Sequence, residues 1–416
     1  MEDEGKTLVI GGGAAGYFTA ITAAEINPSA DIRIVEAGKK ILRKVKISGG
    51  GRCNLTHHCF DPKELSLRYP RGPRELRGAF HHWQPLDTIK WFEQRGVETK
   101  TEDDGRMFPK SNSSQTVIDC LTETARKAGI KTLRENRLLN IEKLHDKWKL
   151  TLAGGETLIA NRVCLALGSL KSSGLEESLS KLGHKIHPSM PSLFSFNLKA
   201  HPLRDLAGIS VQNATVLNHP LGKKQNGPIL ITHRGLSGPA VLRASAWDAE
   251  NLAKLNYRFE TEINWLGQMK PEDLKNQLND FRKKIPTQRT SQNPFPELPK
   301  RLWIKILDLI SIPLETTWAH LSKQHSRNLV GNLLSFRAQV DGKTTNKDEF
   351  VTCGGICLKE VDFKTMESKI HPGLFFAGEC LNLDGITGGF NFQAAWTTGR
   401  IAGQSMAKSY PIETSS

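Results

Sequence analysis

The sequence predicts an α/β protein in which a parallel-sheet domain is interrupted by an inserted β domain and a helical subdomain. Three observations predict this class. A strand, a glycine run and a helix open the chain, short strands and polar helices fill its middle, and a strand and a helix return near its end. We expect residues 1–190 and 347–416 to form the discontinuous first domain, 191–270 and 323–346 the β domain, and 271–322 the helical subdomain.

The first domain begins with a βαβ unit. Residues 7–10 are β-branched and aliphatic and stop at three glycines, residues 14–26 read as a helix of small side chains, and residues 31–35 alternate as a strand ending at Glu36. This order is typical of one half of a nucleotide-binding domain. Later elements expected in the same domain are a helix at 116–128, a hairpin of strands at 148–152 and 157–160, and a strand at 163–167.

The middle of the chain differs from this pattern. After Pro191 short strands alternate with turns, and from Pro271 to Ser322 the sequence is polar and helical. The strands expected there are at 193–198, 214–217 and 229–232. Residues 374–377 and 392–407 then read as a strand and a helix of the first domain. The β part and the helical part are therefore expected to be one insertion.

Gly11, Gly13 and Gly16 form a G-x-G-x-x-G motif between the first strand and the first helix. Gly11 allows a tight turn, Gly13 lets the backbone approach a pyrophosphate, and Gly16 lets the helix pack closely on the strand. Glu36, 20 residues past Gly16, can accept hydrogen bonds from a ribose. The motif predicts a Rossmann-type dinucleotide site and leaves FAD and NAD both open. The expected contacts are Gly11, Gly13, Ala14, Ala15, Gly16, Glu36 and Ala37.

A second glycine-rich helix start lies near the C-terminus. Residues 374–379 read as a buried strand ending in an acid, and G-I-T-G-G-F-N at 385–391 precedes a helix. Amide groups at such a helix start can face a flavin pyrimidine oxygen, where negative charge accumulates on reduction. Together with the N-terminal motif this favours FAD, with Glu379 at the ribityl chain. The expected contacts are Ala166, Gly168, Gly378, Glu379, Gly388, Gly389, Phe390 and Asn391.

A third motif runs from Ser48 to Asn54. Its glycines can press backbone against a flat ring while side chains of three chemical types point at that ring. Lys44, upstream of it, can meet phosphate. The expected contacts are Lys44, Ser48, Gly49, Gly50, Gly51, Arg52, Cys53 and Asn54.

Three residues are candidates for catalysis. Cys53 is the predicted proton donor, because hydride delivery to a C=C bond must be followed by protonation. The alternatives are a packed thiol at Cys53 and a salt bridge at Arg52. His233 and Arg234 either orient the substrate or form a structural corner, and His57 is a lesser candidate acid.

At these motifs the sequence resembles the HI0933-like, or aminoacetone-oxidase-like, family of FAD-binding enzymes. The resemblance implies an FAD domain carrying an inserted β domain and a helical subdomain, and it carries the family's FAD contacts over to the glycine motifs. The chain departs from the family at Asn382, where Asp is usual, and at Phe390, where Tyr is usual, which bears on flavin tuning or substrate contact. The matching stretches are residues 11–16, 48–54, T-H-R-G-L-S-G-P at 232–239 and T-G-G-F-N-F-Q at 387–393.

The 57 Lys and Arg residues exceed the 43 Asp and Glu residues and give a net charge of +14, which favours polyanions such as RNA. With the resemblance, this favours a reductase that passes hydride from flavin N5 to an electron-poor C=C bond, its candidate substrate being uridine in large-subunit ribosomal RNA. The alternatives are a small-molecule oxidase or enone reductase with an aminoacetone- or steroid-type substrate, and an RNA-binding factor that is only stabilised by flavin. Two basic runs are Arg68, Arg71, Arg74 and Arg77, and Arg282, Lys283, Lys284, Arg289, Lys300 and Arg301.

Composition also limits the cofactors and the compartment. The chain has one G-x-G-x-x-G motif, so NAD(P)H is expected only as a transient electron donor. Seven scattered cysteines without a C-x-x-C pair argue against a metal site or a disulfide framework. No apolar stretch approaches the roughly 18 residues of a membrane span, and the short acidic start does not resemble a signal peptide. A cytoplasmic enzyme without a membrane anchor is expected.

Overall fold

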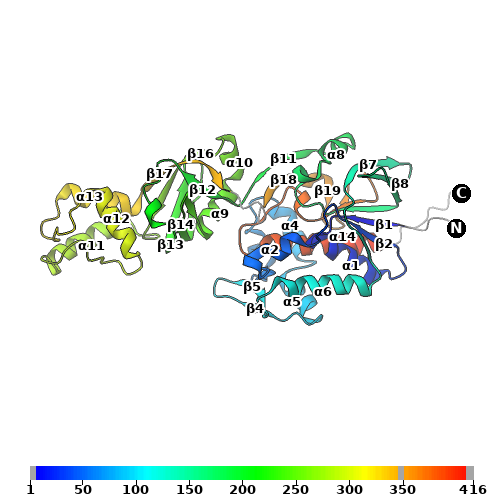
Figure 1. Cartoon of the computed structure of the whole chain (residues 1–416), viewed down its shortest axis with the longest axis horizontal. Coiled ribbons are helices and arrows are strands. Elements are labelled where there is room, and N and C mark those ends of the chain that lie inside the picture. Colours follow the sequence, from blue (N-terminus) through cyan, green and yellow to red (C-terminus); the bar gives the residue numbers. More distant parts are fainter. Residues whose placement is uncertain (1–5, 345–350, 409–416) are drawn as a thin grey trace. The chain divides into compact units, whose positions relative to one another are not determined.

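The computed structural model describes residues 6–344 and 351–408, which form two units (Figure 1). Residues 6–191 and 351–408 make the first unit, and residues 192–344 make the second. The expected domain boundary between residues 346 and 347 lies outside the described residues.

The first unit is built on a seven-stranded sheet in the order β19-β20-β21-β10-β1-β2-β6. Its five parallel strands are β21 (Leu374–Phe376), β10 (Arg162–Leu165), β1 (Thr7–Ile10), β2 (Ile32–Val35) and β6 (Lys131–Leu133), and β20 (Glu367–Ser368) and β19 (Val361–Asp362) are antiparallel. Strands β1 and β21 are buried throughout, because helices cover a parallel sheet on both faces. Since β21 pairs with β10, the two ends of the chain share one sheet. The predicted Rossmann-type α/β class is confirmed.

Helices α1 (Ala14–Ile26) and α14 (Phe390–Ala407) pack directly against each other (Figure 1). Glycines on α14 make this close approach possible. A Cβ on Gly399 would lie 2.8 Å from the carbonyl oxygen of Ala15, and one on Gly403 would lie 2.5 Å from that of Thr19. Phe18 of α1 adds apolar contact, with its ring centroid 5.4 Å from that of Trp396. The helices that begin at the two distant glycine motifs are thereby fixed side by side.

Smaller elements surround this framework. The remaining helices of the first unit are α2 (Arg43–Gly51), α3 (Pro62–Ser66), α4 (Pro73–Phe80), α5 (Pro85–Glu93), α6 (Ser114–Lys127), α7 (Leu170–Ser173) and α8 (Glu176–Lys181). Its remaining strands are β3 (Thr56–His57), β4 (Thr99–Thr101), β5 (Arg106–Pro109), β7 (Leu138–Leu144), β8 (Lys147–Leu152), β9 (Thr157–Ala160), β11 (Ile186–Pro191) and β18 (Thr352–Ile356).

The second unit contains a closed barrel in the order β12-β15-β14-β13-β16-β17. Side chains alternate between the interior and the surface along its strands, as in β17, where Phe336, Ala338 and Val340 are buried and the residues between them are exposed. The barrel elements are β12 (Ser195–Leu198), β13 (Ser210–Asn218), β14 (Gln225–Ile231), β15 (Gly235–Ser237), β16 (Arg258–Asn264) and β17 (Phe336–Thr344), with helices α9 (Pro239–Trp247) and α10 (Ala249–Lys254).

The helical part of the second unit comprises α11 (Pro271–Lys284), α12 (Lys300–Leu309) and α13 (Lys323–Leu334). Helix α13 corrects one expectation, because residues 323–334 were assigned to the β domain. Ser322 caps this helix by accepting a hydrogen bond from the His325 amide at 3.0 Å. Its apolar residues recur at helical spacing and join the core of the unit. Within residues 6–344 and 351–408, no helix combines the length and the apolar character needed to cross a membrane.

Candidate functional site

The N-terminal glycine motif makes a tight turn from β1 into α1. Gly11 has a φ of +116°, and a Cβ there would lie 2.2 Å from the carbonyl oxygen of Ala166. A Cβ on Gly16 would lie 1.9 Å from the carbonyl oxygen of Gly11, so neither position has room for a side chain. A Cβ on Gly13 would meet nothing within 4 Å. This open position at the N-cap of α1 fits the pyrophosphate of a dinucleotide, which binds at helix N-termini.

Glu36 follows β2 and lies beside the glycine turn. Its carboxylate accepts hydrogen bonds from the amides of Gly12 at 2.7 Å and Gly38 at 2.6 Å, one on each oxygen. Each carboxylate oxygen has a second lone pair, so both can accept a further hydrogen bond. The backbone therefore fixes Glu36 in an orientation that leaves capacity for ribose hydroxyls, and Ala37 next to it is exposed.

The third motif turns the chain sharply at the end of α2. Gly49, Gly50 and Gly51 have φ values of +58°, +68° and +84°, a region in which other side chains are strained. Cys53, although not a glycine, also has a positive φ of +63°. Its amide donates to the Ser48 carbonyl oxygen at 3.0 Å and closes the turn.

The position of Cys53 bears on its predicted role as the proton donor. Its side chain is 0% exposed, and this burial raises the pKa of the Cys53 thiol to about 12. This burial favours the alternative, a thiol packed as a small apolar residue, and the catalytic role of Cys53 remains a prediction.

Arg52 forms a salt bridge, which was the alternative to a contact with the cofactor. Its Nη1 lies 2.6 Å from Oε1 of Glu102, and its guanidinium carbon lies 4.0 Å above the centroid of the Phe108 ring. Arg106 also bonds to Glu102, at 3.0 Å. These contacts hold the third motif on the β4–β5 hairpin.

Lys44 and Glu379, expected at different parts of the cofactor, form an ion pair with each other. The second oxygen of Glu379 accepts bonds from the amide and the hydroxyl of Thr352, at 3.1 and 2.9 Å. Gly168 and Gly378 lie close by and have φ values of +71° and +75°. The cofactor contacts assigned to these four residues remain predictions.

The glycine pair before α14 is pressed against strand β3. Gly388 and Gly389 have φ values of +129° and +92°, and a Cβ on Gly389 would lie 2.4 Å from the carbonyl oxygen of Thr56. The amide of Asn54 lies between these segments. With its oxygen toward Gly389 N at 2.9 Å and its nitrogen toward Thr56 O at 3.1 Å, it makes both hydrogen bonds. Asn54 therefore links the third motif directly to the start of α14.

His57 and Tyr69 hold the next backbone groups of this loop. His57 Nδ1 lies 2.9 Å from the Gly388 carbonyl oxygen, so Nδ1 carries the hydrogen, and burial lowers the pKa of His57. The other ring nitrogen faces Gly105, where a Cβ would lie 2.7 Å from it. The Tyr69 hydroxyl donates to the carbonyl oxygen of Phe390 at 2.6 Å. Both ring nitrogens of His57 thus face backbone, which makes it a positioning residue.

A buried ion pair anchors the start of the same loop. Arg71 binds both carboxylate oxygens of Asp384, whose side chain is 0% exposed. Asn391 closes the loop by bonding the amide and the carbonyl of Gly385, each at 2.8 Å. From the sequence, Arg71 is one member of a basic run with Arg68, Arg74 and Arg77, and Asp384 is not singled out. The one signal in the sequence was that Asp384 is an acid beside an apolar, glycine-rich segment, where a buried carboxylate needs a partner.

His233 and Arg234 lie in the second unit, on the turn between β14 and β15, and both are exposed. Two hydrogen bonds tie the backbone of this turn to neighbouring segments. The carbonyl of Thr232 accepts from His201 Nε2 and the carbonyl of Arg234 accepts from the Leu198 amide, each at 2.9 Å. The catalytic roles of His233 and Arg234 remain predictions.

These observations fit FAD. The open helix start at Gly13, the oriented carboxylate of Glu36 and the second helix start at Gly389 all lie in one unit, on helices that pack together. Among residues 6–344 and 351–408 no group of three or more His, Cys, Asp or Glu side chains could hold a metal ion.

The model of the HI0933-like protein Rossmann domain matches residues 5–405. The chain belongs to the HI0933-like family. Its relatives include the ribosomal RNA dihydrouridine synthase of Escherichia coli strain K12, which is 28% identical over 409 residues, covering 96% of this chain and 97% of the relative. The 3-dehydro-bile acid delta(4,6)-reductase of Clostridium scindens is also 28% identical, over 408 residues that cover 96% and 98% of the two chains. This membership makes the chain an FAD-dependent oxidoreductase.

Solved structures share the fold of this HI0933-like protein. The 3-ketosteroid-delta4-(5alpha)-dehydrogenase from Rhodococcus jostii RHA1 matches with a TM-score of 0.52 and 14% identity over 98% of each chain. The open conformation of a flavocytochrome c3 fumarate reductase matches with a TM-score of 0.50 and 15% identity, over 97% of this chain and 78% of the other. At these identities the likeness establishes the α/β architecture only.

Proposed function

We propose that this protein is a reductase that adds hydride from N5 of reduced FAD to an electron-poor C=C bond, and that its substrate is uridine in large-subunit ribosomal RNA. The observation that carries the proposal is the match along nearly the whole chain with two relatives named ribosomal RNA dihydrouridine synthase. That of Escherichia coli covers 96% of this chain, and that of Haemophilus influenzae, also 28% identical, covers 98%. The net charge of +14 suits a polyanionic substrate.

The reaction adds a hydride to one carbon of the double bond and a proton to the other. Bound FAD supplies the hydride chemistry. The electrons come from NAD(P)H, which we expect to bind transiently because the chain holds one G-x-G-x-x-G motif. The residues of the chain bind and orient: the start of α1 and Glu36 hold the ADP part, and the start of α14 presents its amides to the flavin ring.

The candidates for the proton donor are Cys53, His57, His233 and bound water. The Cys53 thiol is buried, and His57 Nδ1 is engaged by the Gly388 carbonyl. His233 and Arg234 are exposed on a fixed turn of the second unit, and we propose that they orient the substrate.

The second candidate function is reduction of a small-molecule enone. The Clostridium scindens relative named 3-dehydro-bile acid delta(4,6)-reductase matches with the same identity over nearly the same length. Such a reaction uses the same hydride and proton transfers on a steroid-type substrate. An oxidase acting on an aminoacetone-type substrate is a third form, in which oxygen takes the electrons.

The test is single-turnover reoxidation of the reduced holoenzyme without oxygen. The enzyme is mixed with ribosomal RNA from cells that lack the gene, or with a steroid enone. We expect RNA to reoxidise the flavin, with one dihydrouridine formed for each flavin oxidised. Reoxidation by the enone alone would establish the second function in place of the first. Peroxide formed in step with oxidation of aminoacetone in air would identify an oxidase.

A further inference from the structure

We propose that one end of the helical part of the second unit binds the phosphate backbone of the RNA substrate. This end carries Lys283, Arg289 and Lys323 and is called the basic end below. The inference rests on the proposed function and adds to it a docking surface outside the glycine motifs.

Positive charge is concentrated in the insertion. Residues 192–346 hold 21 Lys and Arg against 12 Asp and Glu, so they carry +9 of the net +14 in well under half of the chain. Within them, residues 281–289 hold four basic side chains and no acid. A cofactor held in the first unit does not explain charge in this place, whereas a long polyanion does.

Hydrogen bonds bring the chain segments that carry these three residues to one end of the helical part. Arg282, beside Lys283 at the end of α11, donates to the carbonyl of Leu321, two residues before Lys323. The following segment runs alongside 316–319. The amide of Ala319 donates to the Pro286 carbonyl at 3.0 Å, and that of Trp318 to the Gln288 carbonyl at 3.1 Å. Arg289, next in the chain, forms a backbone bridge with Thr317.

These three side chains differ from neighbouring cations in the contacts that they make within the fold. Lys284 pairs with Asp280 at 2.9 Å, and Arg282 bonds to backbone carbonyls. Lys283, Arg289 and Lys323 are exposed, and none has an ion-pair partner within the part of the chain that the structure describes.

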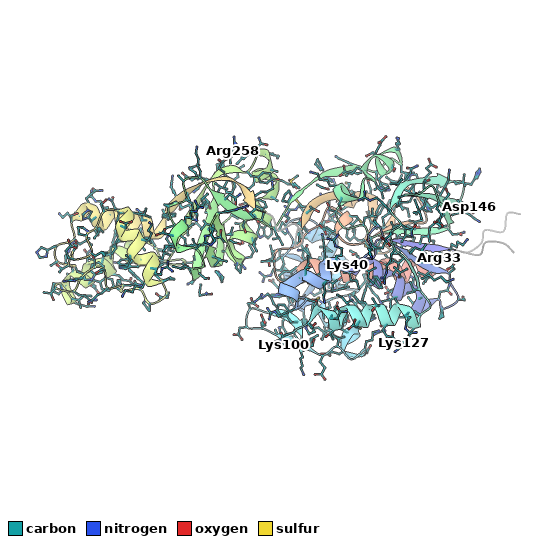
Figure 2. The ribbon with its side chains drawn as sticks, in the orientation of Figure 1. Arg33, Lys40, Lys100, Lys127, Asp146 and Arg258 are labelled. Atoms are coloured by element: carbon teal, nitrogen blue, oxygen red, sulfur yellow. The ribbon has the colours of Figure 1, made fainter. Side chains whose placement is uncertain are left out.

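Exposure alone would not single them out. Lys127 in the first unit and Arg258 in the second are also exposed (Figure 2), but they pair with Glu123 at 3.7 Å and Asp341 at 2.9 Å. Lys323 is the first residue of α13, where the helix dipole disfavours a positive charge. Helix stability therefore explains Lys283, in the last turn of α11, but not Lys323, and a bound phosphate would explain both.

The effect on RNA binding follows from counterion release. Each phosphate contact on a single strand contributes about −0.7 to the slope of log Kobs against log salt, so neutralising three contacts should reduce the slope by about 2. At 0.1 M salt the same relation gives a loss of affinity of about 100-fold. A neutral enone has no phosphates and would be unaffected.

The experiment compares two variants of the FAD-loaded protein with equal charge. The test variant is Lys283→Gln/Arg289→Gln/Lys323→Gln. The control, Lys63→Gln/Lys90→Gln/Lys131→Gln, changes three exposed lysines of the first unit. Binding to a large-subunit ribosomal RNA fragment is measured across a salt titration, together with FAD content and thermal unfolding of each variant. We expect the test variant to show the reduced slope and affinity while the control stays close to the wild type.

Several results would overturn the inference. These are unchanged RNA affinity in the test variant, an equal loss in both variants, or binding of the wild type to anionic lipid vesicles but not to RNA. The proposed function is judged separately. If the test variant loses RNA affinity while dihydrouridine is unaffected by loss of the gene, the surface stands and the function falls. If dihydrouridine depends on the gene, and the test variant binds RNA and restores dihydrouridine like the wild type, the proposed function stands and the docking surface fails.

Discussion

Replacing Arg71 by alanine tests how the loop before α14 is held. Arg71 is 11% exposed and Asp384 is 0% exposed, and the two join through both carboxylate oxygens. Arg71→Ala leaves the carboxylate buried without the guanidinium. Removing one partner of a buried ion pair costs about 3–5 kcal/mol. For a unit of this size that corresponds to a fall in Tm on the order of 10 °C.

The assay is thermal and urea unfolding, with FAD affinity from the quenching of flavin fluorescence. Because the loop leads into α14, we expect Arg71→Ala to weaken FAD binding as well. Arg74→Ala is the matched control, since Arg74 is an exposed arginine a few residues away and has no ion-pair partner among the described residues. It should shift Tm by only about 1 °C, as a surface change usually costs less than about 0.5 kcal/mol.

A double variant separates the charge from the packing. Arg71→Ala/Asp384→Asn removes the buried charge together with its partner, so it should be more stable than Arg71→Ala by about 1 kcal/mol or more. Two results would refute this account of the loop. One is a loss of unfolding free energy below about 1 kcal/mol in Arg71→Ala. The other is a loss in the double variant equal to the sum of the losses in Arg71→Ala and in Asp384→Asn.

Three further predictions concern the N-terminal glycine turn, Cys53 and His57. Gly13→Val should abolish FAD retention with little change in apoprotein stability, because a Cβ there meets nothing within 4 Å, whereas Gly16→Val should destabilise the fold, with a Cβ 1.9 Å from the Gly11 carbonyl oxygen. FAD titration and unfolding of both apoproteins decide this, and full FAD retention by Gly13→Val would contradict the assignment. Cys53→Ala should keep turnover within a few-fold of the wild type; a fall of about 100-fold or more, as for a general acid, would restore Cys53 as the proton donor. Burial lowers the pKa of His57, so the folded state binds a proton at this residue less readily than the unfolded state does. The contribution of neutral His57 to stability is therefore present above the pKa of the unfolded state and is lost as the pH falls through the lower pKa of the folded state. As the pH falls below about 6.5, His57→Gln should therefore flatten the loss of unfolding free energy by up to about 1.4 kcal/mol per pH unit, and an unchanged slope would show that His57 is not responsible.

The sequence predicted best what depends on neighbours in the chain. The helix expected at 14–26 has those bounds in α1, because glycines fix its start and a small-residue pattern marks its length. Helix α13 was missed because its first half is polar, and its apolar residues come only toward its end, where we expected strands. A cap at Ser322 was the local signal for this helix.

The site was predictable where backbone conformation dictates glycine, and less so where side chains meet across the fold. Arg71 and Asp384 are 313 residues apart in the chain, and no local pattern joins them. Cys53 illustrates the opposite difficulty. Its motif is specific, but whether its side chain faces a ligand or the core depends on the positive φ and on the packing around it.

The measurement that tests the central claim most directly is the dihydrouridine content of large-subunit ribosomal RNA in cells with and without the gene. Deletion should remove dihydrouridine from a defined uridine, and the wild-type gene should restore it. The Gly13→Val gene, expressed at the same level, should not restore it, because the claim is that reduction depends on FAD held at the start of α1. Dihydrouridine that is unchanged by deletion, or that the Gly13→Val gene restores fully, would contradict the account.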